Sequence, residues 1–550
     1  MSIGSKFYKR FGLKFVLAYR IRKTKRKILR EVWIQKILMF YGILKLQRDF
    51  EAFKIYQTLR EQNTLIVNPK NLQFIISHYD IILQWLNSKE FKEQYITTNH
   101  PYPPLLNPKR LNAKRDKEKN NNNKETERIK NEGELKECSA NLQSKEAESK
   151  DIQPYPNLSY ESISPELAWD LNLPLPPYYQ FVYWGSHGSG SSGLTTFLEY
   201  CGMIQCPWKG VYGGNGKESY LWYFDKLTQN NNNPDIYLTI REFVKSASKF
   251  YALVPYSKAL LTARDPISNL KSFVQLIIPK EGWDTRASNP ITITLQSNPN
   301  EVCQNLVGYW SMDSKSNLHI GDAPSFETVS YFIDTEQYAG AFHDTQLKNA
   351  LINLKDSIII DMSEIVGEKT FDTIKRLSKE LGFPASIGEE KEKFATQRAI
   401  EYLNFLPIIL QVEISKRKIH IIIQDNVFKT DYLNITSCFF NQDSFYNRII
   451  VCIKEEDWNI LKQDSKALQE VKDYLLKFIP RLQQQKEIED KKQITELQVL
   501  EYFKEHKDLR MQFKQVLDEH LAYIKSLRPD IVESWKYYQE FERMCEEMDK

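Results

Sequence analysis

The sequence predicts an α/β protein in which a parallel sheet is flanked by helices, with helical extensions at both ends of the chain. Two patterns carry this prediction. Between residues 178 and 385, short apolar runs alternate with amphipathic stretches, which is typical of a parallel sheet covered by helices. Before and after this part, apolar residues recur at helical spacing over long segments. A chain of 550 residues has room for about three to four domains, each with its own core.

The first region, residues 1–105, is predicted to be basic and helical. Its segment "KFYKRFGLKFVLAYRIRKTKRKILREVW" has no acidic residue before Glu31. Its aromatic residues recur every four positions, on one helical face: Phe7, Phe11, Phe15 and Tyr19. One interpretation is that residues 1–31 form an interfacial helix on an anionic membrane. The alternative is a solvated basic helix that packs on the rest of the chain. A nucleic-acid partner is not expected, because no recognised nucleic-acid module follows.

The composition favours a cytoplasmic protein. No apolar run is long enough to span a bilayer, and "FVLAY" is too short for a secretory signal, since Arg20 follows it at once. The seven cysteines are scattered without a C-x-x-C pair, which favours free thiols in a reducing compartment over disulfides or a zinc site. We therefore expect a cytoplasmic chain without a bound metal, attached at most peripherally to the inner membrane face.

Residues 106–153 are predicted to be a disordered charged linker. From Lys114 onward this segment is polar and charged, so it cannot bury enough apolar surface to offset the entropy of ordering. Beyond the linker, the sequence predicts an α/β core at 154–395, a mixed α/β extension at 396–465 and a helical C-terminal region at 466–550.

Short apolar and amphipathic runs define the elements of the predicted core. Four apolar runs indicate strands: "FVYWG" (181–185), "YALVP" (251–255), "KALLTAR" (258–264) and "SIIIDM" (357–362). Four amphipathic stretches indicate helices: 192–202, 268–277, 346–354 and 369–382. Two later segments rich in Ile and Val, 406–425 and 445–461, carry further strand-like runs.

The stretch "GSHGSGSSGLTT" after the first predicted strand has the glycine spacing of a phosphate-binding loop. Gly185, Gly190 and Ser192 fit the frame G-x-x-x-x-G-K-[ST], but Ser191 stands where the frame has its lysine. Without that lysine, magnesium-dependent phosphoryl transfer is disfavoured. The glycines, the serines and the start of a helix still predict an anion site. The alternative is a flexible turn before an ordinary helix.

A second element favours the anion site. The segment "KALLTARDPISNLKSFV" predicts a strand that ends at Arg264 and a helix that carries Ser272 about two turns in. Both side chains could then reach one small anion, such as a second phosphate. A third element runs from Asp361 through an acidic loop to a helix closed by Gly382 and Pro384.

These three elements, in this order, resemble the P-loop core of the sulfotransferase fold, over roughly residues 178–385. The resemblance implies that the donor is 3′-phosphoadenylyl sulfate and that no metal is needed. It implies that the donor's 5′-phosphosulfate is held by Gly188, Ser189, Gly190, Ser191, Ser192 and Gly193. It also implies that Arg264 and Ser272 hold the donor's 3′-phosphate.

The sequence departs from the family pattern at two points. Gly188 stands where the family motif P-K-S-G-T-T-W has its lysine, which stabilises the departing phosphate. The family's later nucleotide loop, R-K-G-x-x-G-x-W, is not visible, and the basic "SKRKIH" at 415–420 does not match it. His187 and Lys217 are the candidate cations that could substitute for the lysine.

Sulfuryl transfer also needs a base for the proton of the acceptor hydroxyl. In glycan-modifying sulfotransferases a glutamate in a K-E-P-H-F-F-like stretch supplies this base, and "GNGKESYLWYFDKL" stands at a similar place here. The resemblance therefore points to Glu218, beside Lys217, as the catalytic base, with His187 as the rival base. The aromatic residues after Glu218 either stack on a sugar or build a core.

Two flanking segments carry a further resemblance. "SPELAWDLNLPLPPYYQF" (164–181) and "LRPDIVESWKYYQEFERMCEE" (527–547) resemble a bacterial family catalogued only as a domain of unknown function. Its members share a sulfotransferase-like core and occur in bacteria with elaborate surface glycans. Together the resemblances imply sulfuryl transfer to a cell-surface glycan or its glycolipid precursor. Two alternatives stay open: a non-catalytic scaffold that binds an anion or nucleotide, and a transferase that uses another phosphate-linked donor, such as a nucleotide sugar.

Overall fold

The computed structural model describes most of the chain after residue 68. The described ranges are 69–112, 152–211, 214–231, 233–255, 257–280, 290–312, 317–336, 338, 340–384, 391, 394, 402–426, 431–440 and 449–548. The predicted interfacial helix at 1–31 lies outside them, as does the part of the predicted linker from 113 to 151. The chain divides into two compact units, Met1–Pro177 and Tyr178–Lys550.

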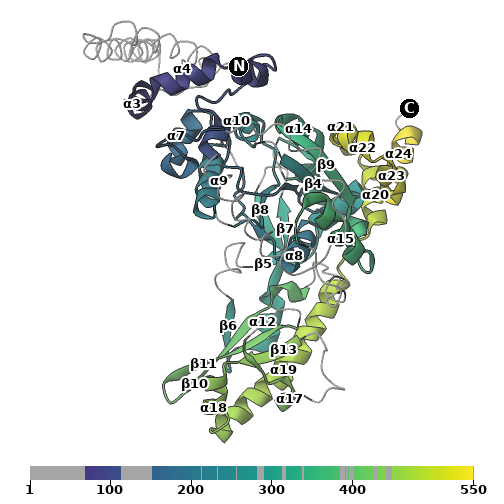
Figure 1. The fold of residues 1–550 in the computed structure, drawn as a ribbon. Helices are drawn as coiled ribbons and strands as arrows, with labels where there is room; N and C mark the ends of the chain where they lie inside the picture. Colours follow the sequence, from purple (N-terminus) through teal and green to yellow (C-terminus); the bar gives the residue numbers. More distant parts are fainter. Residues whose placement is uncertain are drawn as a thin grey trace, which may run out of the picture. The chain divides into compact units, whose positions relative to one another are not determined.

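The first unit is helical in its described part (Figure 1). Its helices are α3 (Pro69–Ser77), α4 (Tyr79–Asn87), α5 (Lys89–Phe91), the π-helix η1 (Lys92–Ile96), the 3₁₀-helix η2 (Tyr160–Ser162) and α7 (Pro165–Asp170). The Trp85 indole donates a hydrogen bond to the Pro104 carbonyl at 3.0 Å. The Leu105 amide donates to the Leu171 carbonyl, also at 3.0 Å. Segments from both sides of residues 113–151 therefore share one core, which includes the buried Leu106.

The second unit contains a five-stranded parallel sheet in the order β2-β3-β1-β4-β9. Figure 1 labels its neighbouring strands β4 and β9. Its strands are β1 (Val182–Trp184), β2 (Ile204–Gln205), β3 (Ile236–Ile240), β4 (Ser257–Ala263) and β9 (Leu354–Asp361). All neighbouring strands are parallel, and Tyr183 pairs with Thr239 on one side and Leu260 on the other. The structure thereby confirms the predicted α/β fold with a parallel sheet.

Three of the four predicted strands are present, as β1, β4 and β9. The prediction of a strand at "YALVP" is wrong, because this segment ends helix α10 (Ser248–Ala252) and continues as a turn. A short apolar run fits a buried helix as well as a strand, and Tyr251 and Ala252 are both buried here. The strand beside β1 is instead β3, which the sequence reading did not identify.

Helices cover both faces of the parallel sheet. They include α8 (Ser191–Tyr200), α9 (Lys217–Gln229), η3 (Lys245–Ala247), α11 (Pro266–Val274), α14 (Asp344–Ala350), η6 (Met362–Ile365) and α15 (Lys369–Leu381). On one face, side chains of α8 and α15 form a core with Tyr183 and Leu260. On the other face, Trp184 stacks on Tyr523 of α22 (Ala522–Leu527), with ring centroids 6.1 Å apart. Gly382, at φ +83°, ends α15 as the glycine in its sequence predicts.

Two smaller sheets also belong to the second unit. One is antiparallel with the order β5-β7-β8: β5 (Ile277–Pro279), β7 (Val307–Met312) and β8 (Leu318–Gly321). The other, named the hairpin sheet here, has the order β12-β13-β11-β10-β6. Its strands are β6 (Ile291–Thr294), β10 (Ile408–Ile414), β11 (Arg417–Asp425), β12 (Leu433–Asn434) and β13 (Ile449–Ile453). Strand β6 pairs parallel with β10, so a segment far upstream completes this sheet.

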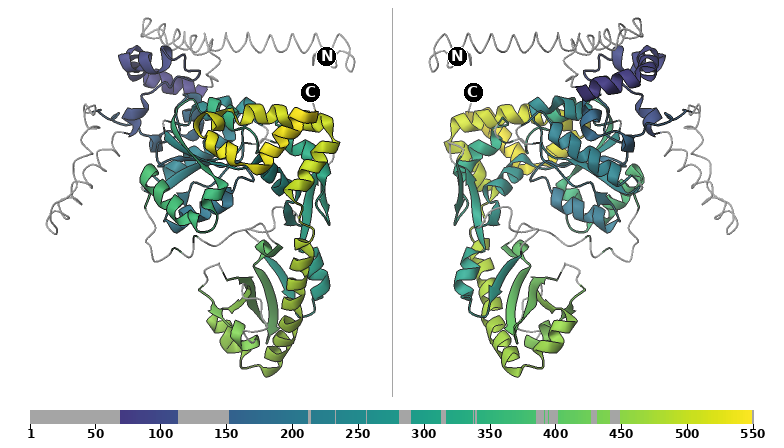
Figure 2. Two further views of the ribbon diagram at one scale, coloured as in Figure 1. Left: turned by 90° about the vertical axis from the view of Figure 1, so that its right-hand side faces the viewer. Right: turned by 90° about the vertical axis from the view of Figure 1, so that its left-hand side faces the viewer.

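Helix α19 (Ser465–Asp490) covers one face of the hairpin sheet (Figure 2). Its Leu475 and Phe478 share a core with Ile419 and Ile421 of β11. Alternate residues of a strand face opposite sides, so Lys418 and His420 lie on the other face. The short helices of this part of the chain are α12 (Pro299–Asn305), η5 (Phe326–Thr328), α13 (Val329–Ile333), η8 (Tyr402–Phe405), α17 (Thr436–Phe439) and α18 (Glu455–Leu461).

The C-terminal helices return to the parallel sheet. They are α20 (Glu496–Glu505), α21 (Lys507–His520), α22, α23 (Pro529–Ser534) and α24 (Lys536–Met548). The Trp535 indole donates to Asp361 Oδ2 at 2.7 Å, and Asp361 ends β9. Asp265 caps α11 with one carboxylate oxygen and accepts the Tyr537 amide at 3.1 Å with the other. Within the described ranges, no helix combines the length and the apolar character that crossing a membrane requires.

Candidate functional site

The candidate site lies where the topology of the parallel sheet reverses. From β1 the chain continues to β2 on one side of the sheet, whereas from β4 the next strand of this sheet is β9 on the other side. In open α/β sheets, ligands bind in the crevice outside the carboxyl ends of two such strands, because their loops run apart there. The loop after β1 contains His187 and Gly188, and Arg264 follows β4 directly. The sequence-predicted residues of both loops therefore lie together at the carboxyl ends of the neighbouring strands β1 and β4.

The loop between β1 and α8 leaves backbone donors available for an anion. Gly188 and Gly190 have φ angles of +77° and +89°, which favour glycine. Ser189 Oγ donates to the Ser186 carbonyl at 2.6 Å and so holds the turn closed. Helix α8 begins at Ser191, and its first three amides, at residues 191–193, donate to no partner among the described residues. Such amides and the helix dipole together favour a bound anion.

Arg264 and Ser272 converge on this loop, as their spacing predicts. Arg264 Nη1 donates to the Gly188 carbonyl at 2.7 Å and to Ser272 Oγ at 2.8 Å. Burial lowers the pKa of the Arg264 guanidinium, and the negative charge of Glu496 partly offsets this effect. Glu496 is itself paired with Lys271, whose Nζ lies 2.7 Å from its carboxylate. The guanidinium stays charged, since arginine is not deprotonated in proteins.

The geometry of Gly188 explains why the loop has no lysine at this position. A Cβ atom on Gly188 would lie 1.8 Å from Asn269 Oδ1 and 3.2 Å from the Phe273 ring, both on α11. The left-handed backbone adds its own strain for any residue with a side chain. A lysine therefore cannot occupy this position unless the Asn269 and Phe273 side chains shift, and the cation bonded to the loop is Arg264 instead.

His187 lies between a hydroxyl and a carboxylate. Its Nδ1 is 2.7 Å from Tyr338 Oη, and its Nε2 is 3.3 Å from Glu242 Oε1. The His187 amide donates to the Gly340 carbonyl at 2.8 Å, which fixes the loop beside the Tyr338 segment. Glu242 follows β3, so it also lies at the carboxyl end of the sheet. Its side chain is buried, with 1% exposed.

This arrangement determines what His187 can do chemically. The Nε2–Glu242 contact lacks hydrogen-bond geometry, but a carboxylate oxygen at 3.3 Å attracts an N–H group, so Glu242 favours the tautomer with hydrogen on Nε2. Nδ1 then accepts a hydrogen bond, and the Tyr338 hydroxyl is the group that donates to it. A substrate hydroxyl in the place of the Tyr338 hydroxyl would present its proton to a base that a carboxylate orients. The sequence reading missed Glu242, because it did not identify β3.

The other two predicted catalytic residues begin helix α9. The Glu218 side chain is exposed, and within the described ranges no hydrogen bond or ion pair joins it to residues 185–193. Lys217 is half-buried, and its amide donates to Asn215 Oδ1 at 3.1 Å. The aromatic residues after Glu218 mainly build a core: Tyr220, Tyr223 and Phe224 are at most 1% exposed.

A buried polar network supports the loop from behind. Ser186 Oγ donates to Asp344 Oδ1 at 2.9 Å, and the Asp344 amide donates to His520 Nδ1 at 3.1 Å. Burial raises the pKa of the Asp344 carboxyl to about 7. Burial lowers the pKa of the His520 imidazole to about 3, which agrees with an Nδ1 atom that accepts a hydrogen bond. The loop is thus connected to α14 and α21, two helices that the sequence reading did not place at the site.

Comparison with known proteins gives one family match. A family model described as a protein of unknown function (DUF2972) matches residues 359–548, about a third of the chain. The matched segment begins within β9 and includes His520 and Trp535, but not the 185–193 loop, Arg264 or Glu242. No curated protein and no solved structure matches the chain significantly. Over its last third, the chain is therefore similar to an uncharacterised family, the protein of unknown function DUF2972.

Proposed function

We propose that the chain is a sulfotransferase-like enzyme that transfers a sulfuryl group from 3′-phosphoadenylyl sulfate to a hydroxyl of a cell-surface glycan or its lipid-linked precursor. The observation that carries this proposal is the convergence of Arg264 on Gly188 and Ser272 at the reversal point of the sheet. A loop with free amides and a neighbouring Arg–Ser pair is suited to a donor with two separate phosphate groups. The sulfotransferase resemblance supplies the identity of that donor.

The donor is proposed to bind along the loop. The amides of residues 191–193 would face its 5′-phosphosulfate, together with the Ser191 and Ser192 side chains. Arg264 and Ser272 would hold its 3′-phosphate, for which the remaining guanidinium donors of Arg264 are suited. Gly188 contributes its left-handed backbone rather than a charge. The amide donors of residues 191–193 at the departing 5′-phosphate would then replace the stabilisation that a lysine gives in the family.

His187 is proposed as the base and Glu242 as the residue that orients it. The acceptor oxygen forms a bond to sulfur while the bond between sulfur and the 5′-phosphate oxygen breaks. The proton of the acceptor hydroxyl moves to Nδ1 of His187, and adenosine 3′,5′-bisphosphate leaves with the electron pair. His187 is favoured over Glu218 because its Nδ1 already lies 2.7 Å from a hydroxyl oxygen within the site. Glu218 stays the second candidate base, and Lys217 the second candidate cation.

A transfer assay tests this proposal. The full chain is incubated with donor labelled in its sulfuryl group and with surface glycan extracted from the source cells, and label in the glycan is counted. We expect transfer that His187→Ala abolishes and that the matched change His506→Ala, at an exposed histidine beyond α20, leaves intact. Transfer from a labelled nucleotide sugar instead would establish the transferase with another donor. Binding of adenosine 3′,5′-bisphosphate without any transfer would establish the non-catalytic nucleotide-binding scaffold.

A further inference from the structure

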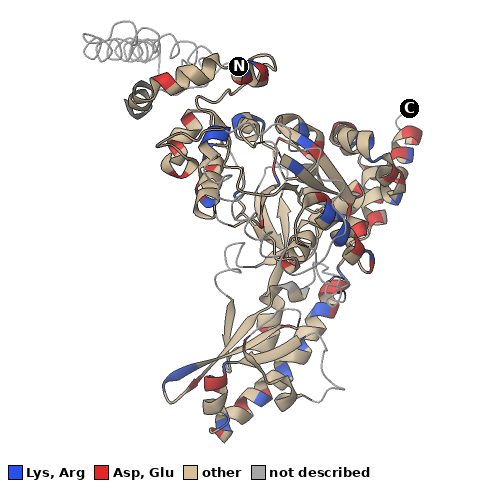
Figure 3. Ribbon diagram, viewed as in Figure 1, with Lys and Arg blue, Asp and Glu red and all other residues tan. Residues whose placement is uncertain are grey.

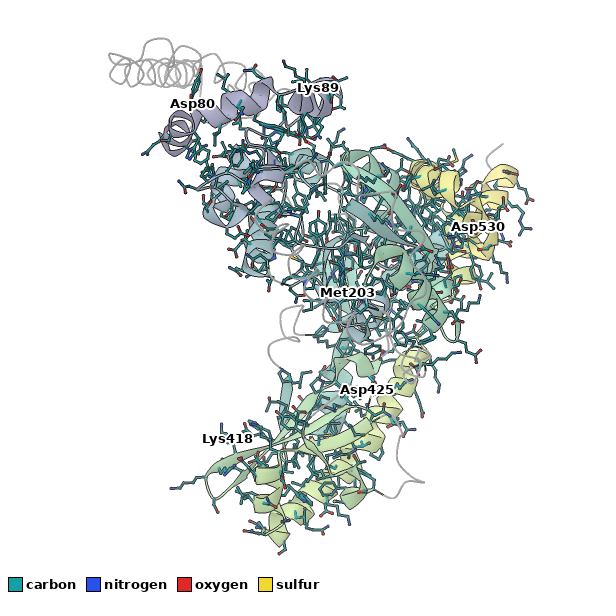
Figure 4. All side chains as sticks on the ribbon, in the orientation of Figure 1. Asp80, Lys89, Met203, Lys418, Asp425 and Asp530 are labelled. Carbon is teal, nitrogen blue, oxygen red and sulfur yellow. The ribbon has the colours of Figure 1, made fainter. Side chains whose placement is uncertain are left out.

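A pocket of about 320 Å³ opens on the hairpin sheet, at the strands around the β10–β11 turn. It is lined by Ile409, Arg417, Lys418, His420, Ile422, Tyr432, Lys454, Glu456 and Asp457, and is called the hairpin pocket here. These residues come from β10, β11, α18 and the segments beside β12 and β13. None of them belongs to the 185–193 loop or its neighbours, so the pocket is separate from the proposed donor site. Lys418 projects from the β10–β11 hairpin (Figure 4).

The strand register places the basic side chains of the hairpin pocket together. Lys418 and His420 are two residues apart on β11, so both face away from α19. Ile409 pairs with Ile422 across the hairpin and forms an apolar floor on the same face. Lys454 comes directly after the paired residue Ile453 of β13, which brings it beside His420. Its ammonium lies 6.0 Å from the ring centre of Tyr432.

The pocket carries surplus positive charge. Arg417 is neutralised, because its Nη2 lies 2.8 Å from Asp457 and 3.8 Å from Glu456. Among the described residues, no carboxylate forms an ion pair with Lys418, His420 or Lys454. The turn of the hairpin is basic as well, and Figure 3 shows Lys and Arg gathered at its tip. An anionic group is the complement of such a lining.

We propose that the hairpin pocket binds an acidic saccharide unit. Lys418 on β11 and Lys454 directly after the neighbouring β13 would bind carboxylate or sulfate groups of the sugar. The Tyr432 ring and the Ile409–Ile422 floor offer apolar surface for a sugar ring. Glu456, which also lines the pocket, can accept hydrogen bonds from sugar hydroxyls. A simple anion would use the two cations but not the aromatic ring or the apolar floor.

This inference deepens the proposed function and rests on it in one respect: it makes the acceptor an acidic glycan. The charge and shape of the hairpin pocket do not depend on the donor site. Failure of one proposal is therefore distinguishable from failure of the other. Changes at Lys418 and Lys454 should leave binding of adenosine 3′,5′-bisphosphate unchanged, and Arg264→Ala should leave saccharide binding unchanged.

The test is isothermal titration of the full chain with tetragalacturonate, which carries one carboxylate on each ring, at low ionic strength. Neutral maltotetraose and inorganic phosphate are titrated in parallel. We expect the acidic tetrasaccharide to bind, the neutral one not to bind, and phosphate to bind at least about tenfold more weakly, since it lacks the ring contacts. Raising the salt concentration should weaken the binding, because the cations are exposed.

Two double variants locate the binding. Lys418→Ala/Lys454→Ala should weaken the binding of tetragalacturonate at least about tenfold, since the loss of even one charge-assisted contact costs about that much. Lys466→Ala/Lys477→Ala removes the same charge from α19 and should have no effect. If both variants weakened the binding equally, the effect would come from the net charge of the protein, and the proposal would be overturned. Binding of phosphate as tight as that of the tetrasaccharide, or equal binding of maltotetraose, would also overturn it.

Discussion

Arg264 donates hydrogen bonds from one guanidinium nitrogen to both the Gly188 carbonyl, at 2.7 Å, and the Ser272 hydroxyl, at 2.8 Å. This relationship joins the loop after β1 to the segment after β4. It also shows why glycine at position 188 is compatible with an anion site. The backbone at Gly188 is left-handed, an added Cβ would meet the Asn269 and Phe273 side chains, and the Gly188 carbonyl accepts a hydrogen bond from Arg264.

Introducing the lysine of the sulfotransferase motif at position 188 should therefore damage the fold. We expect Gly188→Lys to lower the free energy of unfolding by about 3 kcal/mol, because a left-handed backbone costs about 1–2 kcal/mol and overpacking about 1–3 kcal/mol. Gly202→Lys is the matched control, since Gly202 has φ +80° but nothing within 4 Å of its added Cβ. The control should show only the backbone cost in urea denaturation. Equal losses in both variants would contradict the steric explanation.

The assignment of the base predicts different results for two glutamates. Glu242→Gln should lower kcat by roughly 10²- to 10⁴-fold with little change in KM for the donor, because a glutamine amide can donate to Nε2 and favour the wrong tautomer. Nitrogen chemical shifts of His187 should then report hydrogen on Nδ1 rather than Nε2. Glu218→Gln should stay within about twofold of the wild-type rate, since Glu218 is exposed on α9. A large loss with Glu218→Gln and none with Glu242→Gln would make Glu218 the base.

The raised pKa of Asp344 predicts that the free energy of unfolding falls as the pH rises. Its folded-state pKa of about 7 lies above the ordinary value near 4, so the folded protein keeps this proton after the unfolded chain has released it. The contribution of Asp344 therefore becomes less favourable from about pH 4 to about pH 7 and is constant above that. Asp344→Asn should remove this slope while keeping the Ser186 hydrogen bond. The urea midpoints of the wild type and the variant, measured from pH 4 to pH 8, give this slope. An unchanged slope in the variant would show that Asp344 does not cause it.

His520 predicts the opposite slope. Its folded-state pKa of about 3 lies below the ordinary value of about 6.5, so the unfolded chain binds a proton that the folded protein does not. Stability should be fully present above about pH 6.5 and decline as the pH falls toward 3. His520→Gln, whose side chain can still accept the Asp344 amide, should flatten this decline. If the variant lost stability in acid as much as the wild type, other groups would be the cause of the decline.

Local signals in the sequence were sufficient for some parts of this structure and insufficient for others. The ends of β4 and α15 follow from their own residues, since Arg264 closes an apolar run and Gly382 allows a left-handed cap. The contact between Arg264 and Ser272 can also be predicted, because the geometry of a strand followed by a helix brings these two residues, eight positions apart, close together. The partners of Ser186 and His187 do not follow, since Asp344 and Tyr338 lie about 150 residues later in the chain.

Tertiary context decided the remaining elements. "YALVP" is apolar enough for a strand, but its burial beside α9 allows a helix. Strand β3 follows an asparagine-rich segment that obscures where it begins, and without β3 Glu242 has no predicted place at the site. Strand β6 joins the hairpin sheet by parallel pairing to β10, which no local pattern indicates.

The central claim is that Arg264 holds a phosphate of a nucleotide donor, and calorimetric titration with adenosine 3′,5′-bisphosphate tests it most directly. Wild-type protein should bind this nucleotide, and Arg264→Ala should raise the Kd by about 10- to 100-fold, since a charge-assisted phosphate contact is lost. Arg543→Ala, at an exposed arginine of α24, should leave the Kd unchanged, and thermal unfolding checks that both variants are folded. Absence of binding by the wild type, or equal affinity in folded Arg264→Ala, would contradict the account.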